Sequence, residues 1–324
     1  MRTFVKPKVV VSKCLEFDAC RWNGAMISSD VVRLLKPHVD FTPVCPEMEI
    51  GLGVPRKPIR ILSVNGELSL MQHETEKDVT EDMVSFGDGF LGSVGAVDGF
   101  ILKYRSPSCG LKDVMFYPSL GKSRSIGRGC GIFGGAVLER FPLLPIEDEG
   151  RLSNYRIREH FLTKLFAFAD FREVKKIRKM KELVRFQTHN KFMLMAYNQK
   201  ELRLMGRIVA NPEKKPIETV LREYEQHLSS AFLKIPRYTS HINVLMHALG
   251  YFSDALSAKE KAFFLDSLEQ YRNEKIPLSV PVNIAQSWIV RFENEYLSNE
   301  TFFEPYPQDL VEITDSGKGR KLKG

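Results

Sequence analysis

Short apolar runs alternate with amphipathic segments over the first 145 residues. Three strands are predicted, at "KVVV" (8–11), "FTPVC" (41–45) and "VDGFILKY" (97–104). Three helices are predicted from the helical spacing of apolar residues, over 28–39 and 75–94 and after the glycine-rich turn within 127–141. The β-branched first run suits a parallel sheet buried on both faces, and Pro43 places the second strand at an edge or a strand start. The alternation predicts an N-terminal α/β domain built on an open sheet.

The pattern becomes helical after a proline- and acid-rich stretch at 141–154, which has the composition of a linker. Helices are predicted at 154–174, 216–234, 241–252 and 257–275, with helical periodicity also over 175–210. The run "IPLSVPVN" (276–283) predicts an extended, proline-containing break. We therefore expect an α/β domain over 1–148, a mostly α-helical domain over 152–313, and a flexible basic tail over 314–324.

Composition indicates a soluble globular protein rather than a membrane or disordered one. Hydrophobic residues make up 43% of the 324 residues and charged residues 27%. No apolar run approaches the roughly 20 residues that span a bilayer, and the N-terminus lacks the features of a secretory signal. We expect a cytoplasmic protein, in which the five cysteines are reduced thiols or metal ligands rather than disulfides.

Positive charge is concentrated in one segment of the chain. Lys and Arg number 18 against 19 acids over 1–150, 15 against 5 over 151–207, and 14 against 16 over 208–324. The whole net charge of +7 therefore comes from a segment of +10, since the flanks contribute −1 and −2. A solvated helical face is the plain explanation of a charge run. A surface for a polyanion such as nucleic acid is the alternative that this concentration favours.

Three cysteines stand just past the carboxyl ends of the three predicted strands. Cys14 follows the first strand, Cys45 ends the second, and Cys109 follows the third. Because the carboxyl ends of parallel strands line one edge of a sheet, these thiols are expected to meet there. Such a set suits zinc, copper or an iron–sulfur cluster, whereas isolated cysteines are most often small buried hydrophobes. No C-x-x-C pair is present, which excludes a compact zinc knuckle.

Residues with acid–base chemistry accompany these cysteines. Glu47 lies two residues after Cys45 and is followed by a glycine turn and Arg56. Ser106 and Ser108 lie within three residues of Cys109. A turn glutamate, serines that satisfy turn backbone and a surface arginine are the structural alternatives.

At these same positions the sequence resembles the thiouracil desulfidase (TudS-like) family. The stretches "SKCL…CRWNG", "PVCPE…GLGVPR" and "LKYRSPSCG" match the motifs of that family in order, and residues 154–312 resemble the helical domain often fused to it. The fused form is similar to tRNA thiouridine desulfidases, which remove sulfur from 4-thiouridine in tRNA.

The resemblance implies a 4Fe–4S cluster held by Cys14, Cys45 and Cys109, with one iron lacking a protein ligand. That iron would take the thiocarbonyl sulfur of the substrate while water attacks C4, leaving uridine without net redox change. Glu47 corresponds to the acid–base residue for the attacking water, and Ser106 to the residue that assists proton transfer or orients the base. Ser108 is the alternative to Ser106 in this role, because one sequence does not distinguish two neighbouring hydroxyl groups.

One position departs from the family pattern, and two further cysteines have no role in it. Glu16 stands where the family commonly has glycine, which bears on the shape of the first cysteine loop. Cys20, six residues after Cys14, is interpreted as lining the pocket rather than as a ligand. Cys130 matches no ligand motif and is treated as a small turn residue, while the glycines around it could bind a phosphate at a helix N-terminus.

The helical domain is expected to bind tRNA phosphates. The candidate residues are Lys175, Lys176, Arg178, Lys179, Lys181 and Arg185. Two other functions remain open at this point. One is desulfidation of free thiouracil or a thionucleoside, which needs no such basic surface. The other is a non-catalytic RNA-binding protein with a structural zinc or a redox-sensing cluster, whose closed site would recruit Cys20 or a histidine.

Overall fold

The computed structural model describes residues 2–311, and these form two compact units. One unit comprises residues 5–169 together with 307–311, and the other comprises residues 2–4 and 170–306. The division falls within helix α6 (Tyr155–Ile177), which is continuous. The predicted basic tail, 314–324, lies outside the described residues.

A four-stranded parallel sheet organises the first unit. Its strands are β1 (Lys8–Ser12), β2 (Asp40–Val44), β5 (Gly99–Leu102) and β8 (Ile146–Asp148), in the order β2-β1-β5-β8. The three predicted strands are confirmed, and β2, which contains Pro43, is an edge strand. All pairings within this sheet are parallel, so the carboxyl ends of its strands lie along one edge.

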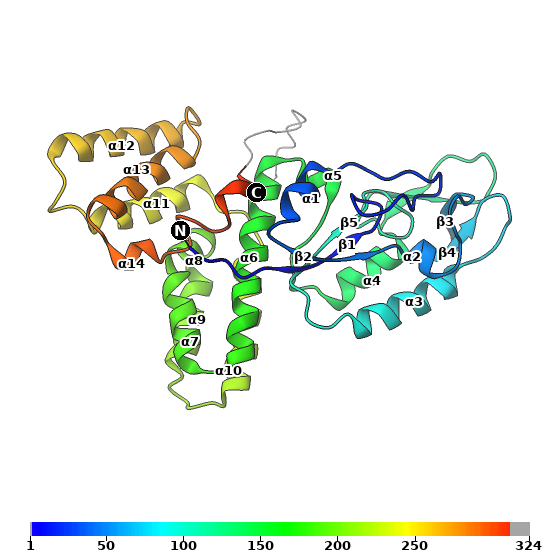
Figure 1. The fold of residues 1–324 in the computed structure, drawn as a ribbon, viewed down its shortest axis with the longest axis horizontal. Coiled ribbons are helices and arrows are strands. Elements are labelled where there is room, and N and C mark those ends of the chain that lie inside the picture. The colour runs from blue at the N-terminus through cyan, green and yellow to red at the C-terminus, as the bar shows by residue number, and fades with distance from the viewer. Residues whose placement is uncertain (1, 312–324) are drawn as a thin grey trace. The chain divides into compact units, whose positions relative to one another are not determined.

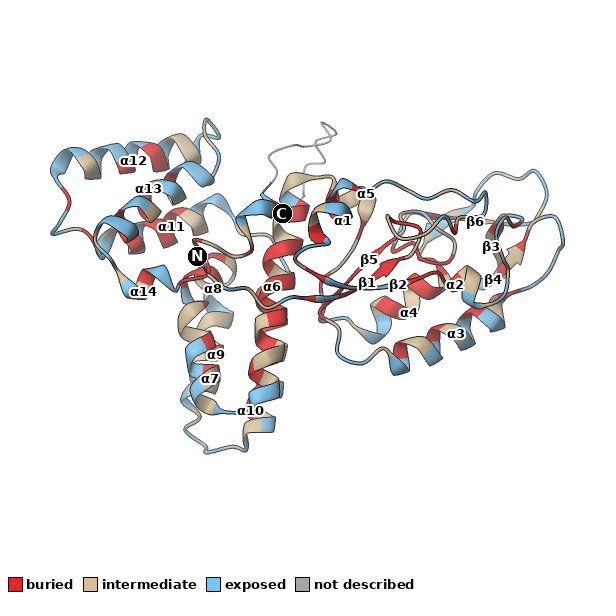
Figure 2. Cartoon of the chain, viewed as in Figure 1, coloured by how far each residue is buried: buried red, intermediate tan, exposed pale blue. Residues whose placement is uncertain are grey.

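Helices cover both faces of this sheet (Figure 1). Helices α3 (Thr80–Ser93) and α4 (Ile132–Arg140) pack side by side on one face, and α1 (Asp30–Leu35) and α5 (Glu149–Leu152) lie on the other. The core under α3 and α4 contains Val10 and Phe100 from the sheet and Met83 and Phe133 from the helices. Figure 2 shows the central strands β1 and β5 as almost entirely buried, as expected for a parallel sheet covered on both sides.

A second, mixed sheet was not predicted. It contains β3 (Ile59–Val64), β4 (Glu67–Gln72), β6 (Val114–Tyr117) and β7 (Gly127–Gly129), in the order β4-β3-β6-β7. Strands β3 and β4 form a hairpin around Asn65 and Gly66, whose φ values of 53° and 86° are those of a type I′ turn. The Asn-Gly pair was the sequence signal for this hairpin.

The prediction of a linker over 141–154 is wrong. This stretch contains β8, which pairs with β5, and the short helix α5, whose N-cap is Asp148. Proline and acidic residues therefore mark the entry into a fourth strand here. Strand β8 is only three residues long, too short for a period-2 pattern to show.

The second unit is helical. Its helices are the later part of α6, then α7 (Met180–His189), α8 (Lys191–Tyr197), α9 (Gln199–Ala210), α10 (Ile217–Ala231), α11 (Tyr238–Gly250), α12 (Ala258–Arg272), α13 (Ser279–Arg291) and α14 (Glu295–Ser298). The N-terminal α/β and C-terminal helical assignment is thus confirmed. The predicted break at 276–283 is wrong, because most of it forms the start of α13. Pro281 is the third residue of that helix, where a missing backbone N–H breaks no helical hydrogen bond.

The part of the chain that the structure describes contains no helix that is both long and apolar enough to cross a membrane.

Candidate active site

The three predicted cysteines lie at the carboxyl edge of the parallel sheet. Cys14 follows β1, and its carbonyl accepts a hydrogen bond from Ile27 N–H at 2.8 Å. Cys45 follows β2 and is the N-cap residue of the short helix α2 (Pro46–Glu49). Cys109 lies in the loop after β5, and all three side chains are buried. The parallel register of β1, β2 and β5 thus brings together residues that are 31 and 64 positions apart.

Ser106 shapes the loop that carries Cys109. Its Oγ accepts hydrogen bonds from the backbone N–H groups of Ser108 (3.3 Å) and Cys109 (3.2 Å), and its carbonyl accepts one from Gly110 N–H (2.8 Å). This is the serine turn that the sequence offered as the structural alternative for Ser106. The turn fixes the direction in which the Cys109 thiol leaves the backbone.

Glycines from the stretch "GRGCGIFGG" pack against the backbone of this cysteine loop. A Cβ added at Gly131 would lie 2.5 Å from Ser108 O, and one at Gly134 would lie 2.4 Å from Gly110 O. Both glycines therefore permit a close backbone approach. Cys130, directly before Gly131, donates a hydrogen bond from its thiol to Leu111 O at 3.0 Å, consistent with its interpretation as a turn residue.

The conformation and contacts of Glu16 show why a glutamate fits where the family commonly has glycine. It has φ of 69°, in the left-handed region that favours glycine. Its carboxylate accepts hydrogen bonds from Ser29 N–H at 2.6 Å and Arg33 Nη2 at 3.0 Å. The Arg33 hydrogen bond is the main reason that the pKa of Glu16 is lowered. The side chain thus anchors the first cysteine loop to the start of α1.

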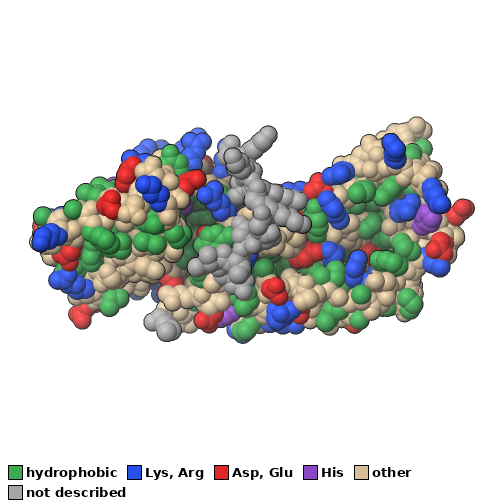
Figure 3. Space-filling model, turned by 90° about the horizontal axis from the view of Figure 1, so that it is seen from above, with side chains coloured by type: hydrophobic (Ala, Val, Ile, Leu, Met, Phe, Trp, Pro, Cys, Tyr) green, Lys and Arg blue, Asp and Glu red, His purple; other side chains and the backbone are tan. Residues whose placement is uncertain are grey.

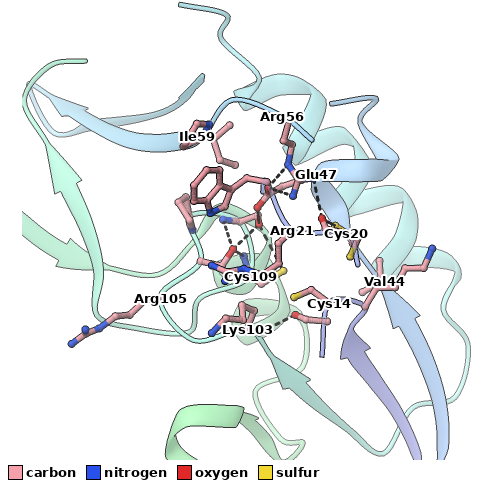
Figure 4. Close-up of a pocket in the computed structure, with 18 of the residues that line it drawn as sticks. Cys14, Cys20, Arg21, Val44, Glu47, Arg56, Ile59, Lys103, Arg105 and Cys109 are labelled. Atoms are coloured by element: carbon pink, nitrogen blue, oxygen red, sulfur yellow. Dashed lines mark hydrogen bonds and ion pairs between the residues drawn. The ribbon is translucent and has the colours of Figure 1, made fainter. Parts of the chain in front are cut away.

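One cavity of about 240 Å³ gathers the predicted site residues (Figure 4). Its walls include all of the predicted ligands and catalytic residues, Cys14, Cys45, Cys109, Glu47 and Ser106. The lining also includes Cys20, Trp22, Arg56 and Ser108. Lys103, another lining residue, is held by an ion pair with Glu149, which follows β8. The wrongly assigned linker therefore positions a cation at the cavity wall.

Glu47 is fixed through both of its carboxylate oxygens. Arg56 donates hydrogen bonds to Glu47 Oε2 from Nε at 2.8 Å and from Nη2 at 2.5 Å. Ser108 Oγ donates to the other oxygen, Oε1, at 2.6 Å, and lies 2.9 Å from Ser106 Oγ. The chain of contacts therefore runs from Arg56 through Glu47 and Ser108 to Ser106. Among the two serines, Ser108 is the one in contact with Glu47.

Arg56 is itself anchored from several sides. Its side chain is 3% exposed, and its Nη1 donates to the carbonyls of Cys20 and Gly53, both at 2.9 Å. The sequence identified Arg56 only as a positive charge near Cys45. Its burial and its two-point contact with Glu47 depend on the loop that folds back between them, which no local pattern reveals.

The pKa values of three cavity thiols are raised. Burial raises the pKa of Cys109 to about 12, and a hydrogen bond with Cys14 is the main cause that raises the pKa of Cys20 to about 11. A hydrogen bond with Cys20, together with burial, holds the pKa of Cys45 well above its ordinary value. Cys45 Sγ also donates a hydrogen bond to the Cys20 carbonyl at 3.9 Å, so these two residues are neighbours. Any metal centre bound by these thiols must displace their protons, since the thiolate is the ligand.

Within residues 2–311, no group of three or more His, Cys, Asp and Glu side chains has the arrangement of a single-ion metal site.

The six predicted RNA-binding residues differ in their ion pairing. Three are paired within the chain: Lys175 with Glu225 at 2.5 Å, Lys176 with Glu173 at 3.8 Å and Arg185 with Glu182 at 2.7 Å. The other three, Arg178, Lys179 and Lys181, have no ion pair among the residues that the structure describes. On the face shown in Figure 3, Lys and Arg side chains lie near Asp and Glu side chains. Three of the six predicted RNA-binding residues therefore already have an acidic partner within the chain.

Comparisons with known proteins follow the division of the chain. Residues 9–149 match the family described as 2-thiouracil desulfurase, and residues 191–307 match a family described as protein of unknown function (DUF1722). The uncharacterized protein YbgA of Escherichia coli (strain K12) is 24% identical over 136 residues, which cover 42% of this chain and 80% of YbgA. The uncharacterized protein YbbK of Bacillus subtilis (strain 168) is 32% identical over 109 residues, which cover 32% of this chain and 72% of YbbK.

A solved structure titled [4Fe-4S]-dependent thiouracil desulfidase TudS is also similar. It is 28% identical, and the match covers 45% of this chain and 93% of that chain with a TM-score of 0.34. The matched family and the site residues agree on the same domain of the chain, the one whose strand ends carry the cysteines. Through residues 9–149 the chain belongs to the 2-thiouracil desulfurase family, a family of desulfidases, and it carries a DUF1722 domain after it.

Proposed function

We propose that this protein is an iron–sulfur-dependent desulfidase that removes sulfur from 4-thiouridine in tRNA and leaves uridine. The observation that carries the proposal is the convergence of Cys14, Cys45, Cys109 and Glu47 on one cavity at the edge of the parallel sheet. Family membership supports the reaction class, and the concentration of basic residues in 151–207 supports the polyanionic substrate.

The donor set at the cavity fits an iron–sulfur cluster. Three buried thiols from three separate strand ends are soft ligands, and the cavity they line gives a substrate access to them. We assign Cys14, Cys45 and Cys109 as the ligands, and Cys20 as a neighbouring thiol. A 4Fe–4S cluster held by three cysteines supplies an iron without a protein ligand, a Lewis acid for a thiocarbonyl sulfur.

The residues of the chain then act on water and protons. Water provides the oxygen that replaces sulfur at C4, and sulfur leaves as hydrosulfide, so no electrons are gained or lost. Glu47 Oε1 accepts the proton of the attacking water, because Oε2 is engaged by Arg56. Ser108, hydrogen-bonded to Oε1, holds or passes that proton, and Ser106 keeps the Ser108 hydroxyl and the Cys109 loop in place. Arg56 keeps the Glu47 carboxylate oriented toward the cavity.

The first experiment measures iron, acid-labile sulfide and zinc in protein purified without oxygen. About four iron and four sulfide per chain are expected. Both should be lost in Cys14→Ala, Cys45→Ala and Cys109→Ala, and retained in Cys20→Ala. Cys130→Ala is the matched control, since that thiol bonds to Leu111 O instead of lining the cavity. One zinc per chain with no sulfide after anaerobic reconstitution would refute the cluster and favour a zinc-stabilised RNA-binding protein.

The second experiment identifies the substrate. The loaded enzyme is given tRNA containing 4-thiouridine, 4-thiouridine nucleoside and free 4-thiouracil, and hydrosulfide release is followed for each. We expect kcat/KM to be highest for the tRNA, because a small base gains nothing from the basic helical segment. Equal or higher kcat/KM with the free base would retain the desulfidase and replace its substrate.

A further inference from the structure

An aromatic residue lies at the active-site cavity on its solvent side. The three predicted cysteine ligands are at most 9% exposed, whereas Trp22, which lines the same cavity, is 45% exposed. Tryptophan is well buried on average in folded proteins, so its exposure beside a cavity stands out. Trp22 is nearer to solvent than the thiols are, and a molecule that reaches the thiols through the cavity comes into contact with it.

The ring of Trp22 has no aromatic or cationic neighbour in the part of the chain that the structure describes. The other tryptophan of the chain, Trp288, is 5% exposed and packs against two rings. Its centroid distances are 6.0 Å to Phe252 and 4.9 Å to Phe264. Trp288 therefore stabilises the core of the helical unit, whereas the ring of Trp22 is available to a ligand.

Tyr104 also lines the cavity, but its ring is already engaged. The Arg105 guanidinium lies 4.8 Å from the centroid of that ring. A Cβ added at Gly150 would lie 3.1 Å from Tyr104 Cδ1, so the backbone of α5 also packs against it. Of these two aromatic residues, Trp22 is the one that can offer its ring to a planar ligand.

Arg56 holds the loop that carries Trp22. The Arg56 N–H donates to Trp22 O at 2.8 Å, and Arg56 Nη1 donates to Cys20 O at 2.9 Å. Both acceptors are backbone carbonyls, so these hydrogen bonds do not require the indole side chain. The same arginine binds Glu47 through Nε and Nη2, and it therefore fixes the tryptophan loop relative to the acid–base carboxylate.

We propose that Trp22 is a substrate-binding residue of the desulfidase, whose indole stacks on one face of the thiopyrimidine ring and holds that ring in the cavity. A base that has left its own stack binds readily to an aromatic side chain through its π face. Water then reaches C4 from the other face, because addition to a planar carbon follows the normal to the ring. This inference rests on the proposed function, because it takes a thiopyrimidine as the ligand.

The test compares cluster-loaded wild type with Trp22→Leu and Trp22→Phe on tRNA containing 4-thiouridine and on 4-thiouridine nucleoside. Both replacements are apolar, but only phenylalanine keeps an aromatic face. Trp22→Leu should lower kcat/KM about tenfold with both substrates, and for the nucleoside the loss should appear in KM rather than in kcat. Trp22→Phe should recover most of the loss. Iron content and Tm should equal those of wild type in both variants, since the side chain is exposed and the loop is held by its backbone.

A fluorescence measurement tests the contact without turnover. The 4-thiouracil ring absorbs at the wavelengths at which indole emits, so a stacked thiopyrimidine should quench Trp22. Glu47→Gln, loaded with cluster, is titrated with tRNA containing 4-thiouridine and with the same tRNA containing uridine. Only the thiolated tRNA should quench strongly. Adding Trp22→Phe should remove that quenching and leave the emission of Trp288, which is buried in the other unit.

The outcomes separate this inference from the proposed function. If wild type releases hydrosulfide and Trp22→Leu keeps the wild-type kcat/KM, the stacking contact is wrong and the proposed function stands. Equal losses in Trp22→Leu and Trp22→Phe would also overturn the contact, because they would indicate an effect of side-chain volume. So would equal quenching by the two tRNAs. A wild type that releases no hydrosulfide from either substrate overturns the proposed function and this inference together.

Discussion

Replacing Arg56 by methionine tests whether this residue holds Glu47 in the active site. The substitution removes two hydrogen bonds to the Glu47 carboxylate and two to backbone carbonyls, while it keeps an unbranched apolar stem. Glu47, whose side chain is 13% exposed, is then left with Ser108 as its remaining contact on this network. Breaking a buried ion pair from one side costs about 3–5 kcal/mol. For a unit of this size we expect Tm to fall by roughly 6–20 °C.

The assay is urea unfolding and calorimetry of Arg56→Met, Glu47→Gln and the double variant. The double variant should be more stable than Arg56→Met alone, with a coupling energy of about 1–3 kcal/mol, because the unpaired carboxylate is gone. Arg21→Met is the matched control, since Arg21 lines the same cavity without an ion pair in the described residues. Arg56→Met within about 1 kcal/mol of that control, or additive effects in the cycle, would refute the argument.

Three further predictions concern other positions. Ser108→Ala should lower kcat per bound cluster about tenfold or more, whereas Ser106→Ala should mainly lower iron content; equal kcat losses would contradict the assignment of roles. Gly134→Ala places a Cβ 2.4 Å from a carbonyl of the cysteine loop and should destabilise the chain by about 1–3 kcal/mol in urea, while Gly135→Ala, with 3.5 Å to its nearest neighbour, should not. Burial raises the pKa of Glu300 from 4.5 to about 7, so the folded chain retains a proton there that the unfolded chain releases. Stability should therefore fall as the pH rises from about 4.5 through about 7, by ~3 kcal/mol at most, and Glu300→Gln should abolish this dependence in pH-resolved urea unfolding.

Sequence periodicity was sufficient where an element is long or strongly patterned. The strands around 8–11, 41–45 and 97–104 and the long helices of the second unit follow from local preference and apolar spacing. Other elements were missed. Strands β3 and β4, with six residues each, were not predicted although an Asn-Gly turn joins them. Strand β8 has three residues, and α13 begins with two prolines nearby, so local composition pointed to a linker and a break.

Some residues of the candidate site could be proposed from the sequence, and others only from the structure. Cys14, Cys45 and Cys109 could be proposed from sequence, since each lies at the end of a predicted strand and parallel strands share that edge. The role of Glu47 was implied by the family resemblance. The place of Arg56 could not be proposed, because its contact with Glu47 depends on how a loop folds back.

The sequence by itself therefore determined three of the strands, the helix-rich second half, the thiols at the strand ends and the segment that carries the positive charge. These features depend on local sequence patterns and on the rule that parallel strands share one edge, so they can be read from neighbouring residues. The tertiary structure decided which residues hydrogen-bond, pack or form ion pairs with the residues that the sequence had singled out. It placed Ser108 rather than Ser106 against Glu47, and packed glycines against the cysteine loop. It also paired Lys175 and Arg185 with acids and left Arg178, Lys179 and Lys181 without ion pairs in the described part of the chain. Such choices depend on contacts between distant residues, whose distances and charges only the folded chain defines.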